Sequence, residues 1–297
     1  MASPELGAAT TAEINTQPEC WARALKLSKN EPAGLPPRGE RVLVLGCGTS
    51  YYMAEAYATL REQSGIGETD AVVASELPEV RRRYDRVVAL SRSGTSAEVV
   101  EAMSRLKGEA PLTAIVGVAS TPVAELADHV IDLGFADEQS VVQTRFATTT
   151  LATLRSALGE ELGAVISDAQ RAVESALPRT PGRQLVILGT GWAASLAQEG
   201  ALKCRESAAA WVEAYPAGEY RHGPIAAADE DTLVWALNPL TDMQRTTVLE
   251  SGASLEEGQL DPMAELIRIQ RLAVRWAAER GRDADSPRNL TRSVTDV

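Results

Sequence analysis

The 297-residue sequence has few of the side chains that bind metals or form disulfides, with three cysteines and two histidines. Cys20, Cys47 and Cys204 are odd in number, lie far apart and form no CxxC pair. This pattern predicts reduced thiols in a cytoplasmic protein rather than a disulfide framework. Because His129 and His222 are the only histidines available, no zinc site is expected, and no metal is predicted.

Long apolar runs are also missing, which excludes a transmembrane helix. The first 20 residues lack the basic head and apolar core of a secretory signal. Acidic side chains exceed basic ones by 41 to 29, and the resulting net charge of −12 argues against nucleic acid or an anionic membrane as a partner. We therefore expect a soluble cytoplasmic protein of two modest domains or one large domain.

Short apolar runs alternate with helical stretches in the first half of the chain. The runs lie at residues 41–45, 71–75, 87–90, 113–118 and 130–133, and the helices at 50–61, 97–107 and 122–127. Such alternation is typical of a parallel sheet that is covered on both faces. A long helical region is predicted from about residue 141 to 177, where prolines end it.

The pattern then starts again. Residues 185–191 resemble residues 42–48, and residues 231–238 resemble residues 85–91 at nearly the same distance from their glycine turn. We infer an internal duplication, with two α/β units that each hold a doubly wound, flavodoxin-like parallel sheet with flanking helices. The predicted division is an N-terminal helix and linker, two such units and a C-terminal tail, at residues 1–37, 38–178, 179–285 and 286–297.

Two loops of the first unit, residues 46–50 and 91–96, have the composition of an anion site, and the first of them has a counterpart in the second unit. Residues 46–50 (GCGTS) form a glycine turn between a strand and a helix, where backbone N–H groups stabilise an anion. Residues 189–194 match GxGxxA, but this pattern is weak, and tight packing of a strand on a helix explains both turns equally well.

The stronger signal is residues 91–96 (SRSGTS), here called the serine loop, which carry four hydroxyls before a helix. An N-cap needs only one such hydroxyl, whereas a phosphate monoester accepts several hydrogen bonds. Both loops follow strands whose carboxyl ends share one edge of the sheet. Residues 238–241 of the second unit lack this cluster, so one phosphate site is expected.

The second unit holds candidate acids and bases. Glu199, Lys203 and Glu206 are spaced i, i+4, i+7 and share one helix face, which is either a solvated ion-paired surface or part of a site. His222 lies in a segment, residues 213–224, that also holds two glycines and two prolines. It is a better catalytic candidate than His129, which borders a strand.

Together these motifs resemble the sugar-isomerase (SIS) domain family, and most of all the isomerase half of glutamine–fructose-6-phosphate aminotransferases and the SIS-type glucosamine-6-phosphate deaminases. The resemblance covers roughly residues 20–297. The matching motifs are GCGTS (46–50), SRSGTS (91–96), EGALKCRE (199–206), EAYPAGEYRHGP (213–224) and SPRNLTRSV (286–294).

The resemblance implies two tandem SIS domains and a role for each matching residue. Glu206 would move a proton between C1 and C2, Lys203 would line the same pocket, and His222 would assist ring opening from the neighbouring subunit of a homodimer. Residues 286–297 would close over the sugar, and no cofactor is implied. The implied substrate-binding residues are Cys47, Gly48, Thr49, Ser50, Ser91, Arg92, Ser93, Ser96, Gln143, Glu199 and Arg292.

Departures from the family pattern qualify this expectation. There is no room for a glutaminase domain before the first unit, so glutamine-dependent synthesis by this chain alone is not expected. Arg292 stands where the synthases have a lysine, and arginine does not form a Schiff base. Arg92 replaces a glutamine and Thr95 a glutamate, which makes the serine loop more attractive to anions. With Gln143 in place of a serine, a sugar other than fructose 6-phosphate stays open.

The leading hypothesis is an amino-sugar phosphate deaminase that converts a 2-amino-2-deoxy-aldose 6-phosphate into a ketose phosphate and ammonia. The second hypothesis is a phosphosugar aldose–ketose isomerase that releases no nitrogen. A non-catalytic sugar-phosphate sensor would need the serine loop but neither Glu206 nor His222. A nucleotide-dependent oxidoreductase would use residues 189–194 and leave the serine loop and the tail unexplained.

Overall fold

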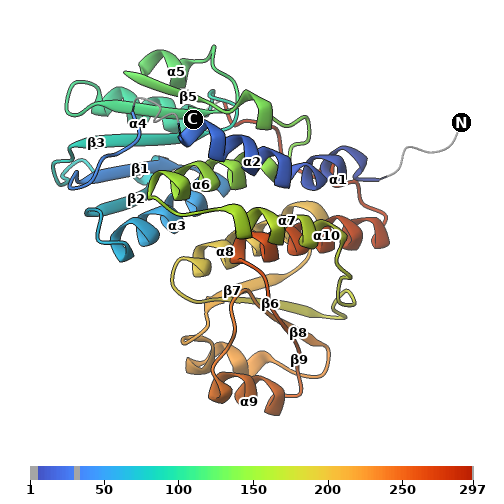
Figure 1. Ribbon diagram of the computed structural model, residues 1–297. Coiled ribbons are helices and arrows are strands. Elements are labelled where there is room, and N and C mark those ends of the chain that lie inside the picture. The colour runs from blue at the N-terminus through green and yellow to red at the C-terminus, as the bar shows by residue number, and fades with distance from the viewer. Residues whose placement is uncertain (1–5, 30–33, 296–297) are drawn as a thin grey trace, which may run out of the picture. The chain divides into compact units, whose positions relative to one another are not determined.

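The computed structural model describes residues 6–29 and 34–295, which divide into two compact units (Figure 1). The serine-loop unit comprises the described parts of Thr16–Gln139, Gln143–Leu162 and Thr291–Val297. The second unit, here called the α8 unit, comprises those of Met1–Asn15, Ser140–Val142 and Gly163–Leu290. Each unit holds one parallel sheet, as the alternation of strands and helices predicts.

The serine-loop unit is built on five parallel strands in the order β2-β1-β3-β4-β5. This is the order of flavodoxin-like sheets. The strands are β1 (Val42–Gly46), β2 (Thr69–Val73), β3 (Arg86–Ser91), β4 (Leu112–Val116) and β5 (His129–Asp132). The helices are α2 (Gln17–Ser28), α3 (Thr49–Gln63), α4 (Ala97–Leu106), α5 (Pro122–Leu126) and α6 (Arg145–Ala157).

Both faces of this sheet are buried. Leu43 and Leu45 of β1 share an apolar cluster with Val99 and Met103 of α4. Side chains alternate across a strand, so Val44 points to the opposite face, and it is buried too. Helix α3 packs on β1 and β2, and α6 packs against α3. The near-continuous apolar runs in the sequence are therefore the strands of a sheet covered on both sides, as expected.

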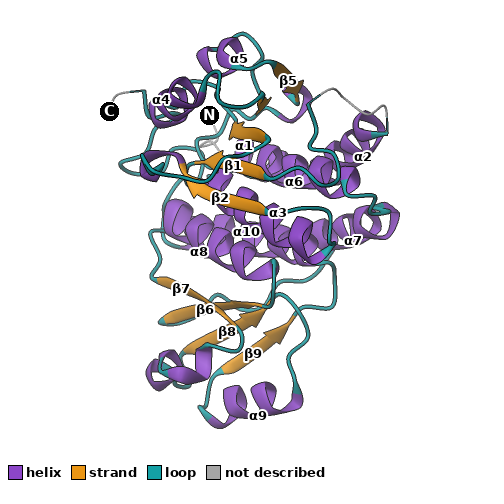
Figure 2. Ribbon diagram, turned by 90° about the vertical axis from the view of Figure 1, so that its left-hand side faces the viewer, coloured by secondary structure: helices purple, strands orange, loops and turns teal. Residues whose placement is uncertain are grey.

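The α8 unit repeats this arrangement with four parallel strands in the order β7-β6-β8-β9 (Figure 2). The order and direction match those of the first four strands of the other sheet, in agreement with the inferred duplication. The strands are β6 (Gln184–Gly189), β7 (Val212–Pro216), β8 (Thr232–Ala236) and β9 (Ser254–Glu257). The helices are α1 (Ala8–Asn15), α7 (Gly163–Glu174), α8 (Ala193–Ala208), α9 (Asp242–Glu250) and α10 (Pro262–Glu279).

Some elements differ from those that the sequence predicts. The long helical region expected from residue 141 to 177 is two helices, α6 and α7, and α7 packs on α10 of the α8 unit. The predicted first domain, residues 38–178, includes α7, whereas in the structure α7 belongs to the α8 unit. β7 overlaps residues 213–224, whose two glycines and two prolines indicate a loop. The sequence does not predict this strand, since only two of its five residues are buried and its last residue is a proline.

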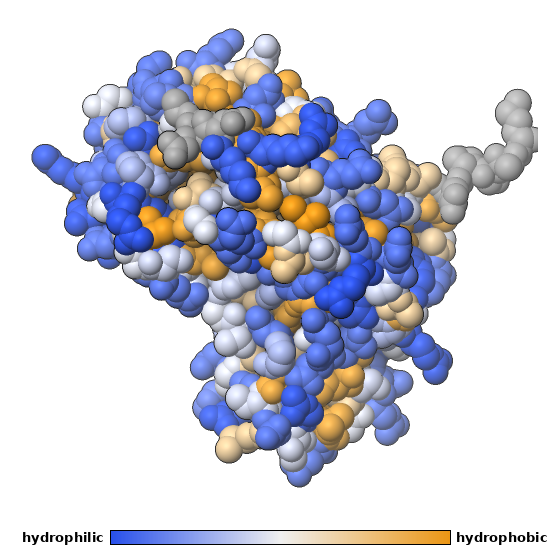
Figure 3. Space-filling view, viewed as in Figure 1, coloured by the Kyte–Doolittle hydropathy of each residue, from blue (hydrophilic) through white to orange (hydrophobic). Residues whose placement is uncertain are grey.

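The face of the molecule seen in Figure 3 is mainly hydrophilic, and the three cysteines are unpaired thiols. In the face drawn in Figure 3, hydrophilic side chains predominate and apolar ones lie between them. Across residues 6–29 and 34–295, no helix is long and apolar enough to cross a membrane. All three cysteines are free thiols. Burial raises the pKa of each of them, and that of Cys204 rises to about 12, so this buried cysteine stays protonated and unreactive.

Both glycine turns allow a strand to pass unusually close to the helix that follows it. A Cβ on Gly46 would lie 2.6 Å from the carbonyl carbon of Ser50, and one on Gly189 would lie 2.1 Å from the backbone oxygen of Ala193. Any side chain would therefore push the helix off the strand. Tight strand-to-helix packing accounts for the first glycine of each turn.

We expect Gly189→Ala to lower the urea midpoint of unfolding, with a loss of about 1–3 kcal/mol, because the added methyl group meets backbone that cannot move aside. Gly218→Ala is the matched control in the same unit, because a Cβ there meets nothing within 4 Å and the backbone φ is not positive. Equal midpoints for the two variants in circular dichroism would contradict this account of the turn.

Candidate functional site

The glycine turn and the serine loop follow neighbouring strands. β1 pairs with β3 in parallel, so residues 47–50 and 91–96 both leave the same edge of the sheet. Gly94 has a φ of +65°, and a Cβ there would lie 2.0 Å from the Thr121 hydroxyl oxygen. Only glycine fits this bend, which turns the chain from β3 into α4.

The hydroxyls of the serine loop serve different purposes. Ser91 Oγ accepts a hydrogen bond from the Gly94 N–H at 3.1 Å, and Ser93 Oγ accepts one from the Thr95 N–H at 3.2 Å. Ser96 is the N-cap of α4, yet its side chain makes no capping hydrogen bond. Two serines thus shape the loop, and the Ser96 hydroxyl stays available at the start of a helix, where an anion is favoured.

The corresponding segment of the α8 unit is hydrogen-bonded differently. The segment between β8 and α9 ends at Thr241, whose hydroxyl caps α9 in a capping box with Gln244. Asn238 Oδ1 accepts a hydrogen bond from the Thr190 N–H in the neighbouring glycine turn. Side chains of the protein itself therefore satisfy the groups that correspond to the serine loop and its glycine turn.

The C-terminal tail lies on the serine loop. Ser293 Oγ is 3.1 Å from Ser93 Oγ and 2.9 Å from Thr95 Oγ1. The N–H of Ala97, the first residue of α4, donates to the backbone oxygen of Val294 at 3.1 Å. The described part of the tail beyond Thr291 is thus held by the loop predicted to bind phosphate.

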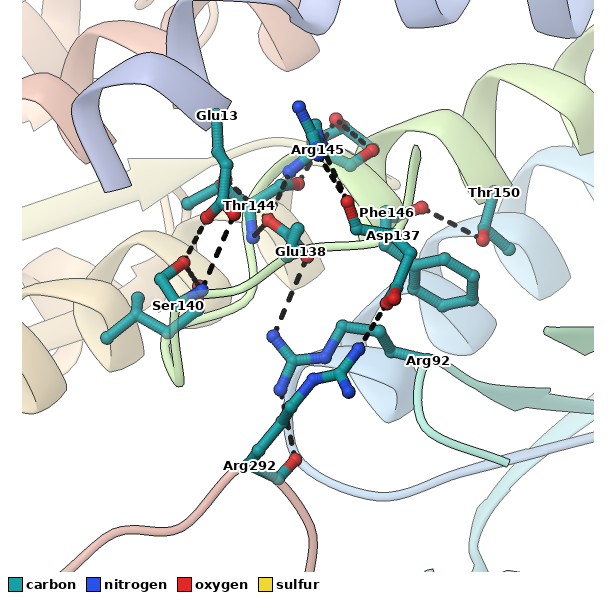
Figure 4. Close-up of polar contacts among 12 residues, drawn as sticks. Glu13, Arg92, Asp137, Glu138, Ser140, Thr144, Arg145, Phe146, Thr150 and Arg292 are labelled. Carbon is teal, nitrogen blue, oxygen red and sulfur yellow. Dashed lines mark hydrogen bonds and ion pairs between the residues drawn. The ribbon is translucent and has the colours of Figure 1, made fainter. Parts of the chain in front are cut away.

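Two arginines join the loop to the tail (Figure 4). Arg92, whose side chain is 1% exposed, has Nη1 3.7 Å from a carboxylate oxygen of Glu138, and its Nη2 donates to the Arg292 backbone oxygen at 3.0 Å. Arg292 forms an ion pair with Asp137. The sequence predicts that Arg92 attracts an anion, but Glu138 balances its charge inside the protein. Neither Asp137 nor Glu138 has a sequence pattern that marks it beforehand.

Other predicted binding residues lie in the same unit. Thr49 and Ser50 are buried in the first turn of α3. The side chain of Cys47 packs against the apolar cluster under α4, and burial raises its pKa, with Glu98 adding to the shift. In the described part of the chain, the buried amide oxygen of Gln143 has no hydrogen-bond partner.

The charged residues of α8 share one face, as their spacing predicts. Lys203 Nζ lies 2.5 Å from a carboxylate oxygen of Glu206 and 3.4 Å from one of Glu199. The side chains of Lys203 and Glu199 are each 1% exposed, and that of Glu206 is 19% exposed. A solvated ion-paired surface is therefore the wrong interpretation, since this face is buried and opens to solvent only at Glu206.

A cavity of about 680 Å³ lies beside Glu206. Its wall is the last turns of α8 together with residues 281–290, which lead into the tail. Arg282 and Arg288 also line it, so cationic and anionic side chains both face its interior. The cavity leaves space for a small polar molecule next to the partly exposed carboxylate.

His222 lies apart from this face. It ends the short 3₁₀ helix Tyr220–His222, its side chain is exposed, and within residues 6–29 and 34–295 no hydrogen bond or ion pair joins it to Glu206. His129, the weaker candidate, is the first residue of β5. The structure thus groups the serine-loop residues in one unit and the α8 residues in the other, with His222 exposed in the α8 unit.

Known proteins share both the sequence pattern and the fold. The profile of the SIS domain family matches residues 38–158. The glutamine–fructose-6-phosphate aminotransferase (isomerizing) of Sulfurisphaera tokodaii is 30% identical over 86% of this chain and 50% of its own length. The chain spans about half the length of the curated relatives that it matches.

Two solved structures show the same fold over nearly their whole length. The glucosamine-6-phosphate deaminase of Thermotoga maritima has a TM-score of 0.78 and 23% identity, covering 96% of this chain and 99% of that one. The tagatose-6-phosphate ketose/aldose isomerase of Escherichia coli has a TM-score of 0.77 and 19% identity, covering 96% and 98%. In sequence, the chain thus matches the SIS domain family over residues 38–158.

Proposed function

We propose that this protein is an amino-sugar phosphate deaminase, which converts a substrate of the glucosamine 6-phosphate type into a ketose 6-phosphate and ammonia. The observation that carries the proposal is the buried charged face of α8, which opens to a cavity only at Glu206. In this proposal the α8 unit is a second SIS domain that supplies the acid–base groups, while the first SIS domain supplies the phosphate site.

The phosphate would be held by the glycine turn and the serine loop. Ser50, Ser91, Ser93 and Ser96 are the proposed hydroxyl donors. The uncapped position of Ser96 supports this role, since the corresponding Thr241 of the α8 unit does cap its helix. The buried amide oxygen of Gln143, which has no hydrogen-bond partner within the described residues, is the proposed contact to a sugar hydroxyl.

Glu206 is the proposed base for the transfer of a proton. In the open-chain aldose its carboxylate removes the proton from C2 and returns it to C1, while a proton passes from the amine nitrogen to the oxygen on C1, which leaves a ketose imine. Water then adds to C2, the proton of the new hydroxyl moves to the nitrogen, and the C–N bond breaks to release ammonia and leave a C2 carbonyl. Lys203, 2.5 Å from Glu206, would act through this carboxylate, orienting it and relaying a proton. Glu199 holds Lys203 from the other side.

His222 is the proposed acid–base group for ring opening, and it would reach the site of the neighbouring subunit in a homodimer. Its exposed position, away from the charged face of its own α8, supports a contribution to another chain. An imidazole can both donate and accept a proton, which suits proton transfer at the ring oxygen.

One observation favours a second candidate, a phosphosugar isomerase without deamination. Arg292, at the tail position where the synthases have a lysine, is ion-paired with Asp137. The tail therefore supplies no amine at this position to handle nitrogen, and the same Glu206 chemistry would interconvert an aldose and a ketose. A sugar-phosphate sensor would bind the sugar and release no product.

We expect purified protein to release ammonia and fructose 6-phosphate from glucosamine 6-phosphate, and Glu206→Gln to lower the rate by about 10²–10⁴-fold, because the amide cannot accept the C2 proton. Glu250→Gln on α9 is the control, because Glu250 is an exposed carboxylate of the same unit. Ammonia would be measured by a coupled enzymatic assay, and the ketose phosphate by mass spectrometry.

Each result separates the candidates. Conversion of unaminated sugar phosphates without ammonia would establish the isomerase instead. Binding of sugar phosphate without any product would favour the sensor. Release of ammonia that persists in Glu206→Gln would show that another group is the base.

A second prediction concerns the shared site. If His222 acts in the partner's site, co-expressed Glu206→Gln and His222→Ala chains form mixed dimers with one intact site each. Random pairing of the two chains then gives about a quarter of the wild-type activity, although each variant alone is inactive. Mixed dimers purified through two different affinity tags should have about half of the wild-type activity, because one of their two sites is intact. No recovery of activity would mean that each site is built within one chain.

A further inference from the structure

Two arginines that depart from the family pattern, one in the serine loop and one in the tail, contact each other's segments. We propose that Arg92 and Asp137 are positioning residues that hold the tail on the serine loop. Arg92 binds the backbone of Arg292, and Asp137 binds its guanidinium. In this proposal, Arg92 and Arg292 together fix the tail on the serine loop, and neither needs to contact the sugar.

The first contact is rigid because Glu138 orients Arg92. Glu138 Oε1 accepts hydrogen bonds from the Thr144 N–H at 2.6 Å, the Thr144 hydroxyl at 2.7 Å and the Arg145 N–H at 2.9 Å. These donors lie at the start of α6, where a carboxylate is stabilised by the helix dipole. The Arg92 guanidinium is buried beside this carboxylate, so its Nη2 is aimed at the tail.

The second contact, between Asp137 and Arg292, is also anchored at the start of α6. The Asp137 backbone oxygen accepts a hydrogen bond from Arg145 Nε at 3.1 Å, which ties residue 137 to the first turn of α6. Its carboxylate then pairs with Arg292, whose side chain is 40% exposed. The buried contact and the exposed contact both hold the same tail residue, one through its carbonyl group and one through its side chain (Figure 4).

The residues after Arg292 are placed by these two contacts. Ser293 reaches the hydroxyls of Ser93 and Thr95, and Val294 accepts the hydrogen bond from Ala97 at the start of α4. An anion bound by Ser93 would meet the tail at this point, a step that rests on the proposed function. Binding at the loop and seating of the tail would then be coupled, and the coupling is reciprocal.

Trypsin cleavage within the tail reports whether these two contacts are formed. Trypsin cleaves after arginine, and cleavage at Arg292 requires its side chain to leave Asp137 and its carbonyl group to leave Arg92. Arg288 is exposed in the same tail, and the described residues offer it no ion pair, so it serves as the internal reference. In the wild type we expect the bond after Arg288 to be cut first, with the bond after Arg292 protected.

Two variants test the two contacts. Asp137→Asn removes the ion pair without disturbing the core, because Asp137 is partly exposed. The combination Arg92→Gln with Glu138→Gln removes the hydrogen bond to the tail and neutralises both members of the buried ion pair. In each we expect the initial rate of cleavage at Arg292, relative to Arg288, to rise about fivefold, as the loss of one charge-assisted hydrogen bond implies.

Arg82→Gln is the matched control, since it breaks an exposed ion pair with Asp70 in the same unit, 3.2 Å long, that does not touch the tail. Mass spectrometry of the intact products identifies each cut, and circular dichroism confirms the fold. An unchanged ratio in Asp137→Asn and in the double variant would overturn the proposal. A rise in Arg82→Gln as well would do the same, because it would reveal general loosening. No substrate is involved, so the result stands apart from the test of deamination.

Discussion

The ion pair between Glu138 and Arg92 is the interaction on which the contact between the serine loop and the tail depends. One carboxylate oxygen of Glu138 accepts three hydrogen bonds from Thr144 and Arg145 at the start of α6, and the carboxylate also faces the buried guanidinium of Arg92. A buried charge is costly unless it is paired and hydrogen-bonded, and here each charge satisfies the other. Glu138 thereby fixes Arg92 of the serine loop relative to α6, and Arg92 in turn holds the tail.

The two units share one backbone arrangement but differ in the polar side chains at their strand ends. Both place a glycine turn after a central strand, and both pass from the next strand into a helix. In the α8 unit, Asn238 and Thr241 satisfy the free N–H groups of these turns. In the serine-loop unit, the Ser96 hydroxyl makes no capping bond. The difference lies in a few polar side chains at the strand ends, while the backbone arrangement is retained.

The sequence was informative wherever a local pattern has a direct physical meaning. Apolar runs predicted strands β1, β3 and β6 because buried parallel strands need apolar side chains on both faces. The spacing of Glu199, Lys203 and Glu206 predicted one shared face, but it could not show that this face is buried. Strand β9 was missed because none of its four residues is fully buried. Asp137 and Glu138 were missed because their partners come from distant parts of the chain.

The charged face of α8 shows why burial changes the meaning of a spacing. On a solvated helix, an acid–base–acid row contributes a few tenths of a kcal/mol and has no chemical consequence. Here Glu199 and Lys203 are withdrawn from water, so the lysine is held between two carboxylates by interactions that solvent screens poorly. Only Glu206 retains contact with solvent, at the cavity. A carboxylate that is oriented by a buried cation and faces a space for a small molecule is placed to exchange a proton with that molecule.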